Sequence, residues 1–343
     1  MLNKAVINLN NLRDNVLEIK KRLPVATKFC AVVKADAYGH GACECANAIY
    51  DLVDCYAVAL VEEGVELRYG SIDKDILVLV SPFDGDILRA LEFNLTLSVC
   101  SLSQIRKINF YAQKLGKKAK VHIKINTGMN RQGVSSISKL KEILEFSANE
   151  NNNVYIDGVY SHFACPENQR ARNLALDKFL LAISTVKGYN NKVVSHISAS
   201  GGFLKGVYLD MVRIGIALYG YKPFNERGLR LKKVMRVYAP VTTVRRLKRG
   251  DGCNYGTFKL EKDQEVALVR YGYADGMPRR KIKGQINFRC MDLTAINAQG
   301  LGVFRGKFIC VMDDAERIAK EYGTISYEIL TKCAIRAQKI YIK

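Results

Sequence analysis

Short apolar segments alternate with amphipathic segments along the first part of the chain. The short segments are rich in β-branched residues and end at turn residues, which predicts strands. They lie near residues 29–34, 55–60, 76–80, 96–99, 120–125, 154–160, 193–197 and 210–214. Apolar residues at helical spacing predict helices before and between them, for example at 11–22, 41–50, 101–115 and 168–187. This alternation predicts an α/β fold with a (β/α)8 TIM-like barrel, and a doubly wound sheet is the alternative.

The pattern changes after Gly220. Pro223 and the polar residues 225–228 resemble a linker, and beyond them short segments alternate with turns that contain Gly and Asp. Strands are predicted at 234–247, 265–271, 285–289, 293–298 and 307–311. We therefore predict a barrel domain over residues 1–222 and a mostly β domain over residues 223–343, and the first strand, at about 4–10, could pair with the second domain. The length of 343 residues suits this division, because such a barrel usually takes about 250 residues.

Five polar residues lie at or just beyond the carboxyl ends of predicted barrel strands. They are Lys34, Lys124, His162, Ser200 and Arg213. Active sites of (β/α)8 barrels are built at that end of the strands. The placement favours the barrel over the doubly wound sheet and predicts that these side chains share one site.

Lys34 ends an apolar strand and is followed by an aromatic residue and two glycines. Burial at a strand end lowers the pKa of a lysine, and a lysine that is neutral part of the time can attack a carbonyl and form a Schiff base. The alternative is a lysine whose amine reaches solvent. Lys34 by itself does not decide between the two.

The segment Lys34–Gly41, with the sequence Lys-Ala-Asp-Ala-Tyr-Gly-His-Gly, resembles the pyridoxal-phosphate lysine motif of alanine racemases. The resemblance implies that Lys34 holds pyridoxal 5'-phosphate covalently and that Tyr38 hydrogen-bonds the cofactor phosphate. It also implies a small amino acid, alanine, as the substrate.

Residues 121–133 resemble a second segment of the same family, in which a lysine is carbamylated and fixes an arginine. The arginine meets the cofactor phenolic oxygen and the substrate carboxylate. The residues at these positions are Lys124 and Arg131. Two bare cations facing one pocket repel each other, and a carbamate would convert this repulsion into an ion pair. A solvated lysine at a strand end is the alternative for Lys124.

Three further barrel segments resemble the family. His162, in Ser161–Ala164, corresponds to the histidine that hydrogen-bonds the catalytic tyrosine. Residues 196–202 and 212–220 resemble the last two barrel strands, which implies that Ser200 and the backbone N–H groups of Gly215 and Ile216 bind the phosphate. Arg213 is then directed at the pyridine nitrogen. Because arginine stays protonated, it donates a hydrogen bond there without transferring a proton.

The chain contains four histidines. A buried, hydrogen-bonded core histidine is the ordinary interpretation of each, and we adopt it for His122 and His196. For His162 the family position favours a role in the site.

The second predicted domain supplies the remaining family positions. Residues 252–256 resemble the loop of the catalytic tyrosine, which makes Tyr255 the second base beside Lys34. Racemisation needs one base on each face of a planar carbanion. The resemblance also places Tyr273 at the substrate entrance, Met291 and Asp292 at the substrate pocket, and Tyr327 at the cofactor phosphate. In the family the tyrosine comes from the other subunit, which implies a head-to-tail homodimer with shared active sites.

Composition and charge argue against nucleic-acid binding, metal binding and membrane contact. The net charge of +20 is spread along the chain without a nucleic-acid-binding motif, so we expect no nucleic-acid partner, although the charge can attract anionic small molecules. Ten cysteines lack the spacing of a zinc site, so reduced thiols and no metal are expected. No apolar run reaches the roughly 20 residues that span a bilayer, and the N-terminus lacks a signal-peptide core. We expect no membrane contact and a cytoplasmic location.

The resemblance extends from about residue 4 to the end of the chain and predicts a racemase that supplies D-alanine for peptidoglycan. A barrel amino-acid decarboxylase and a non-catalytic pyridoxal-phosphate carrier are the rivals. Arg213 argues against the decarboxylase, which benefits from an acidic partner for the ring nitrogen, and the second domain argues against the carrier. The chain departs from the family at Ala199, Asn287, Phe288 and Lys339, which leaves the range of amino acids accepted open.

Overall fold

The computed structural model describes residues 1–149, 151–226, 228–252, 259–279 and 288–343. The described chain forms two compact units. The barrel unit contains residues 13–37 and 42–231, and the sheet unit contains residues 1–12, 38–41 and 232–343.

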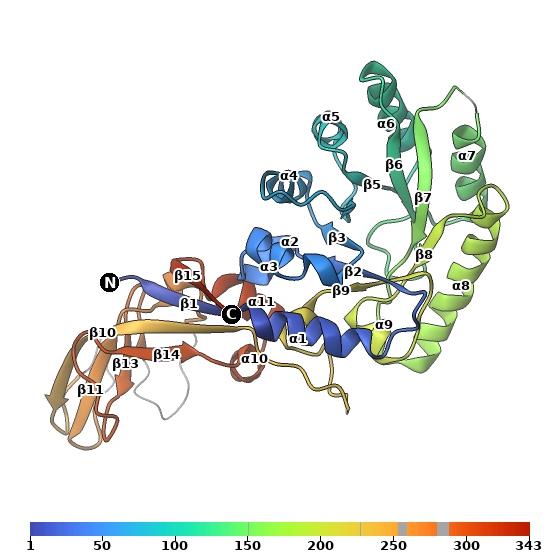
Figure 1. Cartoon of the computed structure of the whole chain (residues 1–343). Coiled ribbons are helices and arrows are strands. Elements are labelled where there is room, and N and C mark those ends of the chain that lie inside the picture. Colours follow the sequence, from blue (N-terminus) through green and yellow to red (C-terminus); the bar gives the residue numbers. More distant parts are fainter. Residues whose placement is uncertain (150, 227, 253–258, 280–287) are drawn as a thin grey trace. The chain divides into compact units, whose positions relative to one another are not determined.

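The barrel unit is built on eight parallel strands, and Figure 1 shows helices on their outer side. The order is β8-β7-β6-β5-β4-β3-β2-β9. A parallel bridge between Ala199 and Arg213 brings the segment after β8 beside β9 and closes the circle. The strands are β2 (Lys28–Val32), β3 (Cys55–Val58), β4 (Ile76–Val78), β5 (Thr96–Val99), β6 (Ala119–Lys124), β7 (Val154–Tyr160), β8 (Val194–His196) and β9 (Met211–Ile214). The predicted (β/α)8 barrel is confirmed.

Polar caps start the outer helices. Ser101, Ser136 and Asn168 each accept a backbone N–H from the first turn of the helix that follows, at 3.0–3.3 Å. The helices of the unit are α3 (Ala42–Ala48), α4 (Val61–Tyr69), α5 (Asp84–Glu92), α6 (Leu102–Lys114), α7 (Ile137–Ser147), α8 (Gln169–Lys187) and α9 (Ser200–Leu204), with the 3₁₀ turns η1 (Tyr50–Leu52) and η2 (Ile216–Tyr219).

Two helical segments each have residues in both units, because a unit boundary falls within them. They are α1 (Leu9–Lys20) and α2 (Lys34–Gly39). The helix predicted at 11–22 starts earlier than expected because the Asn8 side chain accepts the N–H of Asn11 at 2.8 Å and caps α1. It also ends before Pro24, in a tight turn where Leu23 N–H bonds Lys20 O.

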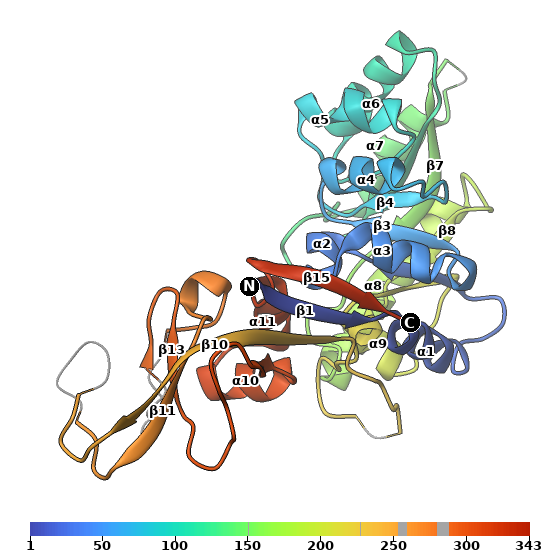
Figure 2. The same cartoon turned by 60° about the vertical axis from the view of Figure 1, so that its left-hand side comes forward.

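The sheet unit is mostly β, as predicted. Its sheet has the order β12-β13-β11-β10-β1-β15, and β14 also pairs with β10. Figure 2 shows β1 beside β15, with which it pairs in parallel. The elements are β1 (Asn3–Asn8), β10 (Met235–Leu247), β11 (Gln264–Val269), η3 (Tyr273–Asp275), β12 (Phe288–Arg289), β13 (Thr294–Asn297), β14 (Phe308–Met312), α10 (Ala315–Tyr322), α11 (Ser326–Lys332) and β15 (Ala337–Ile342).

The sequence patterns did not predict α10 and α11. The local signal for α10 was present: Asp314 accepts the N–H groups of Glu316 and Arg317, and Gly323 ends the helix with a positive φ of 69°.

Candidate active site

Lys34 follows β2 directly and begins the α2 segment. Its side chain is half-buried, and burial followed by the charge of Arg131 lowers its pKa from the ordinary value, while Glu63 acts in the opposite direction. A lowered pKa leaves more of the amine neutral and nucleophilic near neutral pH. The structure therefore gives Lys34 the electrostatic surroundings of a lysine that attacks a carbonyl.

The backbone after Lys34 is left-handed. Ala35, Asp36, Ala37 and Tyr38 have φ values of 51–56°. For L-residues this conformation costs roughly 1–2 kcal/mol per residue. Asp36 Oδ1 accepts the N–H of Ala42 at 2.9 Å and so ties the turn to the start of α3. Strained backbone of this kind collects at functional sites, where the surrounding structure holds it.

Four cations belong to the barrel-unit site: Lys34, Lys124, Arg131 and Arg213. Burial, together with the three other cations, lowers the pKa of Lys124 to about 8, although Cys100 partly opposes the shift. Lys124 Nζ contacts Gln132 Oε1 at 3.2 Å and lies 5.4 Å from the ring centre of Tyr160. Within the described residues no carboxylate lies at ion-pair distance from any of these four side chains. The site therefore carries positive charge that suits an anionic ligand.

Arg213 is buried on β9 and contacts His162. Its Nη2 donates to Ser161 O at 2.7 Å and lies 3.3 Å from His162 Nδ1. Loss of hydration, and then the charge of Arg213, lowers the pKa of His162 to about 3. His162 is therefore neutral at physiological pH, and an unprotonated Nδ1 can accept a hydrogen bond from the arginine.

Ser200 lies where two short turns of the barrel rim meet. Its Oγ accepts the N–H of Gly215 at 3.2 Å and that of Ala217 at 3.4 Å. Ile216 lies between them at the start of η2. The predicted phosphate residues Ser200, Gly215 and Ile216 are thus brought together. Hydroxyl and backbone N–H groups gathered in this way suit a phosphate oxygen.

Tyr38 and Tyr327 are adjacent within the sheet unit. Their ring centres are 5.9 Å apart, and burial raises the pKa of Tyr327 to about 12. Tyr327 therefore remains a neutral phenol that can donate a hydrogen bond.

The other predicted residues of the sheet unit lie at its surface or outside the described chain. Tyr273 is 37% exposed and Met291 is 54% exposed. Asp292 accepts a hydrogen bond from Arg336 at 2.7 Å. Tyr255 lies outside the described residues. The roles assigned to all these residues stay predictions.

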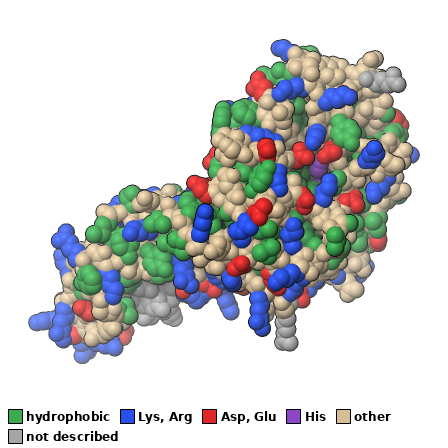
Figure 3. Space-filling view, viewed as in Figure 1, with side chains coloured by type: hydrophobic (Ala, Val, Ile, Leu, Met, Phe, Trp, Pro, Cys, Tyr) green, Lys and Arg blue, Asp and Glu red, His purple; other side chains and the backbone are tan. Residues whose placement is uncertain are grey.

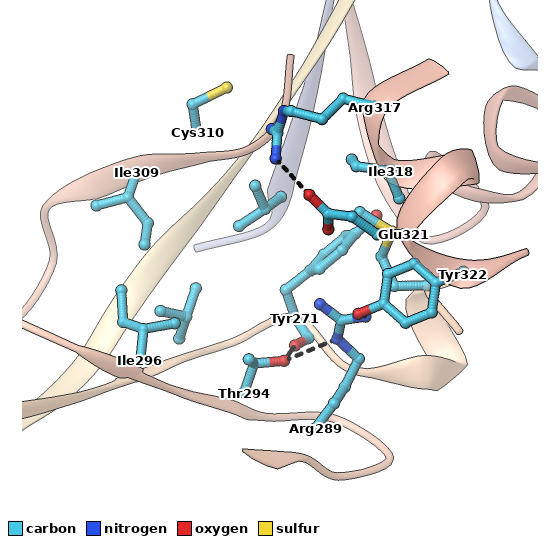
Figure 4. Close-up of a pocket in the computed structure, with 13 residues that line it drawn as sticks. Tyr271, Arg289, Thr294, Ile296, Ile309, Cys310, Arg317, Ile318, Glu321 and Tyr322 are labelled. Carbon is cyan, nitrogen blue, oxygen red and sulfur yellow. Dashed lines mark hydrogen bonds and ion pairs between the residues drawn. The ribbon is translucent and has the colours of Figure 1, made fainter. Parts of the chain in front are cut away.

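A cavity of about 350 Å³ lies in the sheet unit (Figure 4), and none of the predicted site residues lines it. Its two arginines are already engaged. Arg317 pairs with Asp313 at 2.7 Å and with Glu321 at 3.2 Å. Arg289 donates to Pro278 O at 2.8 Å and to Tyr322 at 3.0 Å. The basic site of the barrel, with its unbalanced charge, is the stronger candidate.

On the face in Figure 3, lysine and arginine side chains are spread among acidic and apolar ones. None of the described helices is both long and apolar enough to cross a bilayer. The fold and the site define a (β/α)8-barrel protein with a separate sheet domain and a cationic site at the carboxyl ends of its strands.

Comparison with known proteins identifies the family. The model of the alanine racemase N-terminal domain matches residues 7–223, and that of the C-terminal domain matches residues 234–341. The alanine racemase of Treponema denticola is 34% identical over 99% of this chain and 98% of its own length. The solved alanine racemase of Clostridium difficile has a TM-score of 0.94 at 32% identity and covers 100% of this chain and 96% of that one. The alanine racemase of Bartonella henselae, solved with covalently bound pyridoxal phosphate, has a TM-score of 0.88 at 26% identity, with 100% of both chains covered.

The chain belongs to the alanine racemase family. Members of this family are isomerases that depend on pyridoxal phosphate and interconvert L- and D-alanine. The predicted fold, family and enzyme class are confirmed.

Sequence reasoning missed several side chains of the site. The carboxylate of Glu63 acts electrostatically on Lys34, the Tyr160 ring lies beside Lys124, and His196 contacts Arg213. Glu63 and Tyr160 belong to no recognised motif, and His196 was interpreted as an ordinary core histidine.

Proposed function

We propose that this protein interconverts L- and D-alanine with pyridoxal 5'-phosphate held on Lys34, and supplies D-alanine for peptidoglycan. The main support is the half-buried Lys34, whose pKa is lowered by burial and then by Arg131, with Glu63 acting in the opposite direction but not at ion-pair distance in the described structure. The relatives are named alanine racemases, and one of them is solved with covalently bound pyridoxal phosphate.

The residues present fit this cofactor. A phosphate suits Ser200 and the backbone N–H groups of Gly215 and Ile216, since these groups converge in the described structure. A pyridine nitrogen suits Arg213, which can donate but does not give up its proton. When bound, pyridoxal phosphate supplies an electron sink that makes the α-proton of an amino acid acidic.

Two bases complete the proposal. Lys34 takes or delivers the α-proton on one face of the substrate, and Tyr255 does so on the opposite face. The assignment of Tyr255 rests on its family motif. His162, neutral and in contact with Arg213, tunes the tyrosine through hydrogen bonding. Arg131 holds the substrate carboxylate, and a carbamate on Lys124 would hold Arg131 in place.

We also propose a head-to-tail homodimer in which the partner supplies Tyr255, Met291 and Asp292 to each site. Tyr273 then lies at the substrate entrance, and Tyr38 and Tyr327 bind the phosphate. Alanine racemases solved with cycloserine and with L-Ala-P indicate the class of ligand expected here. The cytoplasmic location stays a prediction.

The test is α-proton exchange in deuterated water, followed by NMR with L- and D-alanine. The wild type with pyridoxal phosphate should exchange and interconvert both enantiomers. Tyr255→Phe should lose proton removal from L-alanine by a factor of about 10²–10⁴, the usual contribution of one general base. Tyr189→Phe, at a 47% exposed position away from the site, is the matched control. A wild type that binds the cofactor but changes neither alanine would contradict the proposal and favour the carrier.

A further inference from the structure

Arg213 is a buried cation whose charge is not balanced by an adjacent carboxylate of the described chain. It is 2% exposed. Besides His162 and His196, its guanidinium contacts the carbonyl oxygens of Ser161, His196 and Ile197. A buried charge usually requires a counter-ion or a complete set of hydrogen bonds. The contacts of Arg213 therefore need to be followed beyond its first neighbours.

A chain of polar contacts leads from Arg213 to a carboxylate on β7. Arg213 Nη1 lies 2.5 Å from His196 Nδ1, and His196 Nε2 lies 2.9 Å from His122 Nδ1. His122 Nε2 lies 3.7 Å from Asp157 Oδ2, an ion-pair distance longer than a hydrogen bond. His196 and His122 are both buried, whereas the Asp157 side chain is 31% exposed. Two imidazoles thus connect the buried arginine to a carboxylate near solvent.

The donor and acceptor groups fix which atom donates in each hydrogen bond between Arg213 and Asp157. A guanidinium can only donate, so His196 Nδ1 must accept. His196 is neutral, because burial and the charge of Arg213 hold its pKa well below the ordinary value. Its proton is therefore on Nε2 and is donated to His122 Nδ1. Because Nδ1 of His122 accepts this hydrogen bond, the proton of His122 is on Nε2 and points toward Asp157.

The strands are shaped around this contact. Val121 pairs with Ile156, but His122 pairs with Gly158, so Asp157 is the extra residue of a β-bulge. A Cβ on Gly158 would lie 2.5 Å from the imidazole of His122, so only glycine leaves room for the ring. Bulges near active sites redirect side chains. The bulge and the glycine are two separate features of β7 that accommodate one histidine.

Asp157 faces other charges as well. His122 is the first cause that holds the pKa of its carboxyl below the usual range, followed by Lys120 and Lys28. Lys120 is already paired with Asp75 at 3.0 Å. The imidazole chain is therefore the contact that distinguishes Asp157 from the surface carboxylates around it.

We propose that Asp157 is the remote counter-ion of Arg213, and that Asp157, His122 and His196 are positioning residues that orient the guanidinium toward the cofactor's pyridine nitrogen and keep its protons on the arginine. This inference rests on the proposed function, because it assumes the cofactor beside Arg213. Both imidazole dipoles present their negative ends to Arg213, which stabilises its cationic form. The carboxylate itself lies outside the pocket. Inside the pocket it would repel the phosphate and the substrate carboxylate.

The first measurement reads the proton positions without the cofactor. Cofactor-free protein labelled with ¹⁵N-histidine is observed in long-range ¹H–¹⁵N spectra, and the four histidines are assigned by single substitutions. Both His122 and His196 should carry a proton on Nε2 and none on Nδ1. A proton on Nδ1 of His196, or a doubly protonated His196, would break the donor chain and overturn the proposal whatever the enzyme does.

The second measurement reads the ring nitrogen in the holoenzyme loaded with ¹⁵N-pyridoxal phosphate. Asp157→Asn should shift this nitrogen signal toward that of a protonated pyridine and lower kcat about tenfold, the scale of one charge-assisted hydrogen bond, with little change in KM. Asp75→Asn is the matched control, because it also removes a carboxylate beside Lys120 but does not face His122. It should leave the ring signal unchanged.

The outcomes separate this inference from the proposed function. If the protein racemises alanine but the ring signal is the same in Asp157→Asn, Asp75→Asn and wild type, the inference is wrong and the function stands. If the protein does not bind pyridoxal phosphate, the proposed function and the orienting role fail together. The histidine spectra still decide whether Asp157 terminates the chain from Arg213, because that part requires no cofactor.

Discussion

The Oε1 atom of Glu63 accepts the backbone N–H of Ala35 at 2.7 Å, directly after Lys34. Its Oε2 accepts the N–H groups of Ala59 and Leu60 at 2.6 and 3.1 Å. One carboxylate therefore caps α4, holds the left-handed turn and stabilises the charged form of Lys34. This position links the backbone strain of the site to the reactivity of its lysine.

The pKa of Lys34 should move in opposite directions in two variants. Arg131 lowers this pKa and Glu63 raises it, so Glu63→Gln should lower it further and Arg131→Gln should raise it. Because only the neutral amine attacks an aldehyde, the pH midpoint of the reaction with pyridoxal should fall in the first variant and rise in the second. The reaction of cofactor-free protein is followed by absorbance, with Lys34→Ala as the blank. Midpoints that move in the same direction would contradict the assignment.

The left-handed turn should become more stable with glycine. Ala35 is exposed with a φ of 51°, so Ala35→Gly should raise the free energy of unfolding by about 0.5–1 kcal/mol, the relief of strain less the entropy of glycine. The control is Ala171→Gly, an exposed position in the right-handed helix α8, which should lower it by about 0.5–1 kcal/mol. Urea denaturation measures both. The same sign in both variants would show that the turn stores no strain.

Lys124 should form a carbamate. Its pKa of about 8 leaves neutral amine available, and a carbamate would place a negative charge among three cations. With ¹³C-bicarbonate, we expect a ¹³C carbamate signal that is absent in Lys124→Arg. At constant dissolved CO₂ the signal should grow as pH rises through about 8, because only the neutral amine reacts. A signal that survives in the variant would place the carbamate elsewhere.

Ser200→Ala should weaken binding of pyridoxal phosphate about tenfold or more, because a hydrogen bond to a charged group contributes about 1.5–3 kcal/mol. Ser198→Ala is the control. Its Oγ donates to Val207 O at 2.7 Å, so the variant loses a buried hydrogen bond and stability but should keep its affinity for the cofactor. Equal losses of affinity in the two variants would indicate a general loss of structure rather than a phosphate contact. Fluorescence titration of cofactor-free protein gives the affinities.

The local sequence pattern was enough to predict the barrel strands and to single out the motif residues. Apolar, β-branched segments can be buried only as strands of a sheet covered by helices, so the alternation itself predicted the barrel. The barrel then explains why the charge of Lys34 acts on Lys124, since parallel strands present their carboxyl ends at one rim. The family resemblance of the motif segments supplied the chemistry.

What the tertiary structure decided depends on contacts between residues far apart in sequence. No local pattern distinguishes His122 and His196 from ordinary core histidines, because their protons are directed by Arg213 at one end and Asp157 at the other. The bulge that exposes Asp157 to His122 is a mismatch between two strands and exists only once they pair. Similarly, Ala35 and Ala37 are good right-handed helix formers, and their left-handed turn is held by Glu63 and Asp36 against that preference. By itself, the sequence determined which elements form and which motifs they carry; the tertiary structure decided how charges and protons are arranged between them, because electrostatic and hydrogen-bond energies depend on distances that folding alone sets.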